Sequence, residues 1–186
     1  MRAAIVLAAG ASRRFGRQDK LAANLRGRSL LDCAIANAHA SGVQRVIVVT
    51  ARSQRIPGVT LVLAKLARDG LSESLAAGLA ALRPIEREAL VFLGDMPFAR
   101  APRTLRRARA DATRPHFCGR PGHPMLILAS AARKALLAGD AGLGGKLKTT
   151  FVRGDAGNIL DIDTTAMLAR VRRHGSRALG PRCTPS

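Results

Sequence analysis

The chain has 186 residues, and its 31 Lys and Arg against 12 Asp and Glu give a formal net charge of +19 at pH 7. This length suits one domain that buries a sizeable hydrophobic core. The high charge suggests a nucleic-acid partner, but the sequence has no Trp or Tyr, no zinc-finger spacing and no basic helix with heptads. We therefore predict no nucleic-acid partner, and we expect the arginines on solvated faces and where smaller polyanions bind.

The three cysteines, Cys33, Cys118 and Cys183, form no C-x-x-C pair, and the sequence shows no signal-peptide pattern. An odd count argues against a secreted disulfide framework, so we expect reduced thiols in a cytoplasmic protein. No segment approaches the ~20 consecutive apolar residues of a membrane-spanning helix. The sequence therefore predicts no membrane association.

A short apolar run at residues 3–8 is followed at Gly10 by a loop of glycine, hydroxyl and basic residues. The run has the length of a buried strand. The loop carries Ser12, Arg13, Arg14, Gly16, Arg17 and Lys20. It is neither a P-loop nor a dinucleotide fingerprint, because five residues separate Gly10 from Gly16. Glycines let backbone N–H groups approach an anion, so we predict that the loop binds a polyphosphate.

Two further elements follow this loop. Ser29 and Asp32 fit a capping box, and apolar residues then fall on one helical face until Gly42. Residues 43–50 are rich in valine and predict a strand, which completes a βαβ unit. Residues 59–64 predict another strand.

Residues 70–82 predict a helix, because leucines recur at helical spacing and should form a core-facing stripe. The leucines are Leu71, Leu75, Leu79 and Leu82. The helix begins with Gly70, Ser72 and Ser74, small and hydroxyl-bearing residues at a point where free backbone N–H groups are exposed. Capping explains one of the two serines at most, so contact with an anion is the alternative for this helix start.

Residues 88–93 predict a buried strand that is followed by Gly94, Asp95, Met96 and Pro97. The carboxyl ends of parallel strands share one edge of a sheet, so Asp95 should lie near the loop after the first strand. Mg²⁺ takes one or two carboxylates and completes its shell with water and phosphate oxygens. We predict that Asp95 is a metal ligand with no obligatory protein partner; turn formation is the alternative.

The segment at residues 102–110 predicts an Arg-rich helix, and residues 124–128 predict a strand. Between them a loop framed by Gly122 and Pro124 presents His123, which lacks the spacing of a triad or a zinc site. A lone loop histidine is usually a hydrogen-bonding spacer. We therefore expect no nucleophile or metal ligand there.

The last elements are a predicted helix at residues 130–137 and a predicted strand at residues 158–163. Asp161 and Asp163 stand two apart and should point to the same side of that strand. Thr164 then caps a helix that runs to about His174.

Strands that alternate with helices predict an α/β fold, a three-layer sandwich around a mostly parallel twisted sheet. We expect one domain over residues 1–174, with an antiparallel excursion near residues 121–128. Residues 175–186 are polar and lack periodicity, so we expect a mobile tail.

Five segments, in this order, resemble the MobA-like NTP transferases, and most closely the molybdenum cofactor cytidylyltransferases. The segments are L-A-A-G-A-S-R-R-F-G-R-Q-D-K, G-L-S-E-S-L, G-D-M-P, P-G-H-P and D-I-D-T. The resemblance implies a nucleotide-diphospho-sugar transferase-like, Rossmann-like fold. It also implies a chemistry in which CMP passes from CTP to the phosphate of molybdenum-loaded molybdopterin and pyrophosphate is released.

The same resemblance assigns roles to individual residues. The implied nucleotide-binding residues are Leu7, Ala8, Ala9, Gly10, Ser12, Arg14, Lys20, Gly70, Leu71 and Ser74. Of these, Arg14 and Lys20 are implied to be catalytic, holding the triphosphate. Mg²⁺ is the implied cofactor, held by Asp95 with Asp163. The implied acceptor-binding residues are Pro97, Gly122, His123 and Pro124.

Other functions stay open at this stage. The double alanine in L-A-A-G favours CTP, because the related guanylyltransferases tend to have L-A-G-G, but a GTP donor or a sugar or alcohol phosphate acceptor would use the same loop and metal. The family often has an asparagine where this chain has Ala64, and an arginine where it has Gly144, with Lys146 nearby. These departures keep a non-catalytic escort that delivers molybdenum cofactor to a client molybdoenzyme as a second class of function.

Overall fold

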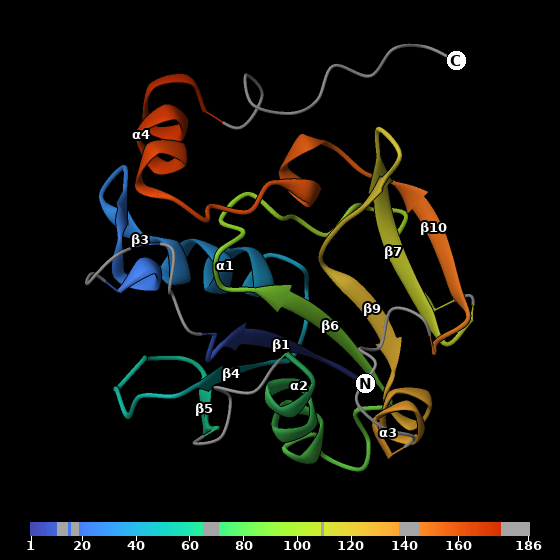
Figure 1. Cartoon of the computed structure of the whole chain (residues 1–186). Helices are drawn as coiled ribbons and strands as arrows, with labels where there is room; N and C mark the ends of the chain where they lie inside the picture. The colour runs from blue at the N-terminus through green and yellow to red at the C-terminus, as the bar shows by residue number, and fades with distance from the viewer. Residues whose placement is uncertain (11–14, 16–18, 65–70, 109, 138–145, 176–186) are drawn as a thin grey trace.

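The computed structural model describes residues 1–10, 15, 19–64, 71–108, 110–137 and 146–175 (Figure 1). Ser12, Arg14 and Gly70 lie outside these residues, as do Gly144, Cys183 and almost all of the predicted tail. The expectations for them therefore stay predictions, as do the proposed domain limits.

One large sheet forms the centre of the described chain, with strand order β10-β7-β9-β6-β1-β4-β5 and β8 paired to β7. The strands of this sheet are β1 (Arg2–Ala8), β4 (Arg45–Thr50), β5 (Thr60–Leu63), β6 (Glu88–Leu93), β7 (Ala112–Phe117), β8 (Arg120–Pro121), β9 (Met125–Leu128) and β10 (Thr149–Arg153). A separate hairpin pairs β2 (Asn24–Leu25) with β3 (Arg28–Ser29). Strands β5, β4, β1 and β6 run parallel, whereas β9 is antiparallel to β6 and to β7.

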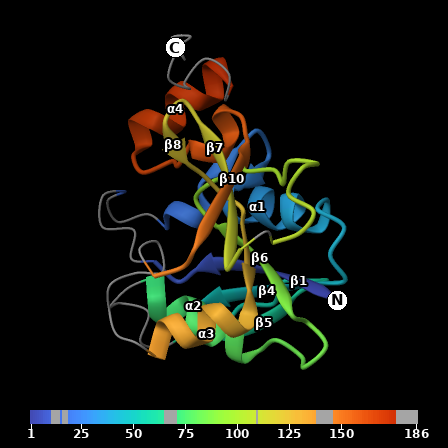
Figure 2. The same cartoon turned by 90° about the vertical axis from the view of Figure 1, so that its right-hand side faces the viewer.

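Helices cover both faces of the sheet (Figures 1 and 2). The α-helices are α1 (Leu30–His39), α2 (Leu71–Ala80), α3 (Ala129–Leu137) and α4 (Thr165–His174), with short 3₁₀ helices η2 (Lys20–Ala22) and η4 (Ala156–Ile159). One apolar core packs α2 and α3 against one face, and a second packs α1 against the other. The predicted three-layer α/β sandwich with a mostly parallel sheet is thus confirmed.

Local signals placed the caps of two helices correctly. Helix α1 begins after Ser29, whose Oγ accepts the Asp32 N–H at 3.0 Å in the predicted capping box. Helix α4 begins after Thr164, whose Oγ1 accepts the Met167 N–H at 3.1 Å. The antiparallel β9 is the expected departure from the parallel sheet.

Four predictions were wrong. Residues 102–108 form turns, because this Arg-rich segment lacks an apolar stripe and buries mainly Leu105. Residues 158–163 contain the end of η4 and an irregular segment in place of a strand, because the Asn158 side chain bonds neighbouring loops. Leu71 is 57% exposed and lies outside the leucine core.

The fourth wrong prediction concerns the cysteines. Cys33 is a free thiol as expected, but Cys118 is disulfide-bonded.

No helix in the described ranges is long and apolar enough to cross a membrane.

Candidate active site

The site begins where β1 and β6 end side by side. These parallel strands pair Leu7 with Leu93, and the Gly94 N–H donates to the Leu7 carbonyl at 2.9 Å. A Cβ at position 94 would lie 3.2 Å from the Leu7 oxygen, a tight contact that a side chain could make only with a small shift of the backbone. The short Gly94 turn therefore places Asp95 beside the segment that follows β1, as the sequence predicted.

Lys20 joins two distant carboxylates at this edge of the sheet. Its Nζ lies 2.8 Å from Asp95 Oδ2 and 2.5 Å from Asp163 Oδ1. The Ile162 N–H donates to the Asp95 carbonyl at 3.0 Å, which fixes the D-I-D segment against the turn after β6. The structure thus brings three predicted site residues together.

The position of Lys20 differs from the sequence expectation in one respect. The Lys20 side chain is only 9% exposed, so it is buried between carboxylates and does not project freely from a loop. Asp95 consequently has a protein partner, which corrects the expectation that it would have none. Asp19 orients Lys20, because its side chain accepts the Leu21 N–H and caps η2 at the residue before the lysine. Arg52 contacts Asp19 at 3.0 Å from a largely exposed position.

Among the residues that the structure describes, this cluster carries more negative than positive charge. Burial lowers the pKa of the Lys20 ammonium, but hydrogen bonds to Asp163 and Asp95 outweigh burial, and the net effect is a raised pKa. Burial also raises the pKa of the third carboxyl group, Asp161, and the negative charges of Asp163 and Asp95 add to that effect. One ammonium among three carboxylates leaves room for a further cation.

The donor set fits a divalent ion that is shared with a phosphate. Within the described residues, no three His, Cys, Asp or Glu side chains are grouped so as to hold a metal by themselves. Mg²⁺ typically takes only one or two carboxylates and completes its shell with water and phosphate oxygens. Asp95 and Asp163 would provide these two carboxylate ligands.

The loop before β9 borders the same edge of the sheet. The Gly122 N–H donates to the Pro115 carbonyl at 2.7 Å, and the His123 N–H donates to the Asn158 carbonyl at 2.8 Å. A Cβ at Gly122 would lie 2.3 Å from the Asn158 oxygen, so only glycine fits there. Pro124 is buried and follows a cis peptide bond.

Asn158 is a positioning residue that the sequence reading missed. Its side-chain N–H groups donate to the carbonyls of Arg100 and His123, each at 2.7 Å, and the residue is only 1% exposed. A polar residue beside the apolar pair Ile159 and Leu160 was the available signal.

His123 is held as a neutral ring. Its Nδ1 donates to the Val91 carbonyl at 3.1 Å, and Nε2 faces the Arg114 guanidinium at 3.4 Å. Burial, followed by the positive charge of Arg114, lowers the pKa of His123 to about 4. This geometry agrees with the predicted spacer.

His123 should make stability depend on pH. At pH between about 4 and 6.5 the unfolded chain protonates this histidine and the folded chain does not, so acidification favours unfolding across that window. We expect the urea midpoint to fall as pH falls through it, and His123→Gln to flatten the fall. His39→Gln, at an exposed histidine of α1, should keep the wild-type slope; an unchanged slope in His123→Gln would contradict the assignment.

The other predicted residues surround this edge of the sheet. Leu7, Ala8 and Ala9 are buried and Gly10 is exposed, so the segment after β1 emerges at Gly10. Ser74 is 3% exposed within α2, whose first residue is the exposed Leu71. The Pro97 carbonyl accepts from Asn37 Nδ2 at 2.9 Å, which ties the G-D-M-P turn to α1.

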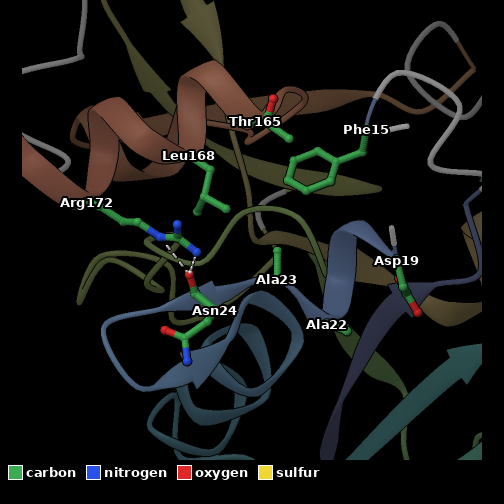
Figure 3. A pocket seen from close by; sticks show the side chains of 8 residues that line it. All are labelled: Phe15, Asp19, Ala22, Ala23, Asn24, Thr165, Leu168 and Arg172. Carbon is green, nitrogen blue, oxygen red and sulfur yellow. Dashed lines mark hydrogen bonds between the residues drawn. The ribbon is translucent and has the colours of Figure 1, made fainter. Parts of the chain in front are cut away.

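A separate cavity of about 440 Å³ lies between η2 and α4 (Figure 3). It is lined by Phe15, Asp19, Ala22, Ala23, Asn24, Thr165, Leu168 and Arg172. Arg172 donates to the Asn24 carbonyl from both Nε and Nη2 and so already has a partner. None of the predicted site residues lines this cavity.

Open α/β sheets bind their ligands at the carboxyl ends of the strands, which is where the lysine–carboxylate cluster of this chain lies. The chain belongs to the MobA-like NTP transferase family, whose domain profile matches residues 4–153. It is therefore a nucleotidyltransferase that takes a nucleotide substrate. A comparison with curated protein sequences gives no match.

Solved structures agree on the fold. A manganese complex of Rv0371c from Mycobacterium tuberculosis is 23% identical with a TM-score of 0.70, over 92% of this chain and 98% of that one. Molybdopterin-guanine dinucleotide biosynthesis protein A from Archaeoglobus fulgidus is 20% identical with a TM-score of 0.69, over 92% and 97%. The 2-C-methyl-D-erythritol 4-phosphate cytidylyltransferase from Thermus thermophilus is 18% identical with a TM-score of 0.69, over 96% and 98%.

Proposed function

We propose that this protein transfers CMP from CTP to the phosphate of molybdenum-loaded molybdopterin, forms the cytosine dinucleotide cofactor and releases pyrophosphate. The observation that carries the proposal is the Lys20 ammonium between Asp95 and Asp163. This cluster lies where β1 ends in the L-A-A-G segment and where β6 leads into the G-D-M-P segment. A buried cation beside excess carboxylates suits a reaction in which charged phosphates and a divalent ion meet.

The reaction needs positioning and charge stabilisation from the protein, with no covalent intermediate. An oxygen of the acceptor phosphate attacks the α-phosphorus of CTP in line, the bond to the bridging oxygen breaks, and pyrophosphate leaves. In this proposal Lys20 stabilises the charge on the leaving pyrophosphate, and Arg14, outside the described residues, assists it. Asp95 and Asp163 would hold Mg²⁺, which when bound neutralises phosphate charge.

A pyrimidine donor is supported by the L-A-A-G segment. In this proposal the methyl group of Ala9, which is 6% exposed, narrows the space for the base relative to the glycine of L-A-G-G. Less room favours the smaller base. The solved relatives include both a guanine dinucleotide protein and a cytidylyltransferase, so the fold by itself is compatible with either donor.

The choice of donor can be tested with a panel of NTPs and Mg²⁺. We expect CTP to raise the melting temperature most, and pyrophosphate release with molybdenum-loaded molybdopterin to favour CTP over GTP by at least about 10-fold, or ~1.4 kcal/mol. A preference for GTP would move the protein to the guanylyltransferases. Binding of acceptor without pyrophosphate release from any NTP would favour the escort.

A further inference from the structure

Strands β7 and β10 present an open sheet face next to the candidate active site. The two strands are parallel and pair Arg114 with Phe151 and His116 with Arg153. Paired residues and those two apart point to the same side of a sheet, so these four side chains share one face. Ala112, on the same side of β7, belongs to the core under α2 and α3. Figures 1 and 2 show β7 and β10 extending beyond those helices.

This face carries an aromatic pair that is accessible to solvent. The rings of Phe151 and His116 meet edge to face, with centroids 5.6 Å apart and an interplanar angle of 62°. Phe151 is 55% exposed, one of the few large apolar side chains of the described chain that are. An exposed ring on a rigid strand offers a stacking surface to a planar ligand.

Arg114 adds a cation without a carboxylate partner. Its Nε donates to the Gly122 carbonyl at 3.1 Å and its Nη2 contacts His123, but within the described residues no Asp or Glu pairs with it. The side chain is partly buried, which is unfavourable for an unpaired charge. An anionic ligand would supply the missing partner in bidentate geometry.

Contacts across the sheet connect Arg114, and the aromatic pair beside it, to the strand that leads into the active site. Arg114 contacts His123, which bonds Val91 of β6, the strand that leads into Asp95. The order β10-β7-β9-β6 places Phe151 three strands from β6. At about 4.8 Å a strand, Phe151 lies roughly 14 Å from β6, and the Arg114 side chain, which reaches His123, lies between the two.

We propose that this face is the acceptor subsite and takes a phosphorylated planar heterocycle, with the ring on Phe151 and the phosphate on Arg114. The inference rests on the proposed function, which it deepens by naming two specificity residues that the motifs did not contain. Arg153, exposed on the same face, supplies a second positive charge beside the ring.

Riboflavin 5′-phosphate is a suitable probe, because it joins a planar heterocycle to a phosphate and its fluorescence reports stacking. Riboflavin tests the ring alone, and glycerol 3-phosphate tests the phosphate alone. We expect the wild-type protein to bind riboflavin 5′-phosphate more tightly than either part. Phe151→Ala and Arg114→Ala should each weaken it by at least about 10-fold, whereas Arg114→Lys should recover part of the affinity.

Matched controls separate this subsite from general surface effects. Ile85 is as exposed as Phe151, at 55%, and lies before β6 at the other end of that strand, so Ile85→Ala should bind the probe like wild type. Arg103→Ala removes an exposed arginine from the turns after β6 and should also have no effect.

The CTP-dependent rise in melting temperature is measured in the same variants. If wild type binds CTP with Mg²⁺ but probe affinity is the same in Phe151→Ala, Arg114→Ala and Ile85→Ala, the subsite is refuted and the proposed function stands. If no NTP binds wild type, the proposed function fails whatever the probe does. A single-stranded oligonucleotide that displaces the probe and needs both residues would instead assign the face to nucleic acid, and would overturn the inference.

Discussion

Asp95→Asn should abolish Mg²⁺-dependent nucleotidyl transfer and also lower the melting temperature of the metal-free protein. The loss of turnover follows from the proposed ligand role, and we expect at least about 10²-fold, the scale seen when a preorganised charge interaction is removed. The loss of stability follows from Lys20, whose buried ammonium would keep only Asp163 as a charged partner.

The loss of stability is the opposite of what an Asp95 with no protein partner, as the sequence predicted, would show. Without a partner for Asp95, removing its charge would relieve repulsion among carboxylates and leave the metal-free protein at least as stable. The 2.8 Å contact with Lys20 changes the sign. Because Asn can still accept a hydrogen bond from the ammonium, we expect a loss of about 1 kcal/mol, below the several kcal/mol of a fully broken buried pair.

Glu88→Gln is a matched control for Asp95→Asn. Glu88 pairs with Arg2 at 2.6 Å and is 25% exposed, against 29% for Asp95, but it lies at the opposite end of β6. It should lose a similar amount of stability and keep full turnover. An Asp95→Asn protein that retains transfer would refute the metal assignment, and one with unchanged stability would show that the Lys20 contact contributes little.

The elements that form the site could be predicted because their signals are local. The capping box at Ser29 and the apolar run of β6 identify structure within a few residues. The general rule that parallel strands share a carboxyl edge then placed Asp95 beside the loop after β1.

The position of Asp163 beside Lys20 could not be predicted in the same way. It meets Lys20 across 143 positions of sequence, and it does so from an irregular segment that the sequence reading took for a strand. What holds that segment is the contact between Ile162 and the Asp95 backbone, which carries no signature in residue type.

The position of Arg114 on strand β7 could not be predicted for a related reason. Its sequence A-T-R-P-H-F contains a proline and lacks a β-branched run, so its pattern did not indicate a strand. Pro115 cannot donate a backbone hydrogen bond, but its carbonyl still accepts the Gly122 N–H at 2.7 Å. Only the register with β10 shows that Arg114 and Phe151 lie side by side.

Lys20→Met should separate the two tasks of this lysine, because its effects on metal and on catalysis have opposite signs. In the structure the ammonium occupies the space between Asp95 and Asp163, so any divalent ion must compete with it for these oxygens. Without the ammonium we expect Mn²⁺, measured by its paramagnetic signal in the absence of nucleotide, to bind at least about 10-fold more tightly. Turnover should nevertheless fall by about 10²-fold, since the leaving pyrophosphate loses its cation.

Stability provides a third readout. Lys20→Met removes the positive charge that Lys20 supplies to two partly buried carboxylates, so the metal-free protein should melt at a lower temperature than wild type. Added Mn²⁺ should raise the melting temperature of the variant by more than it raises that of wild type. Arg52→Met is the matched control, because it removes a cation 3.0 Å from neighbouring Asp19 but one that is 74% exposed, and exposed pairs contribute little. If Lys20→Met binds Mn²⁺ no better than Arg52→Met does, Lys20 does not compete with the ion, and the divalent site lies away from Asp95 and Asp163.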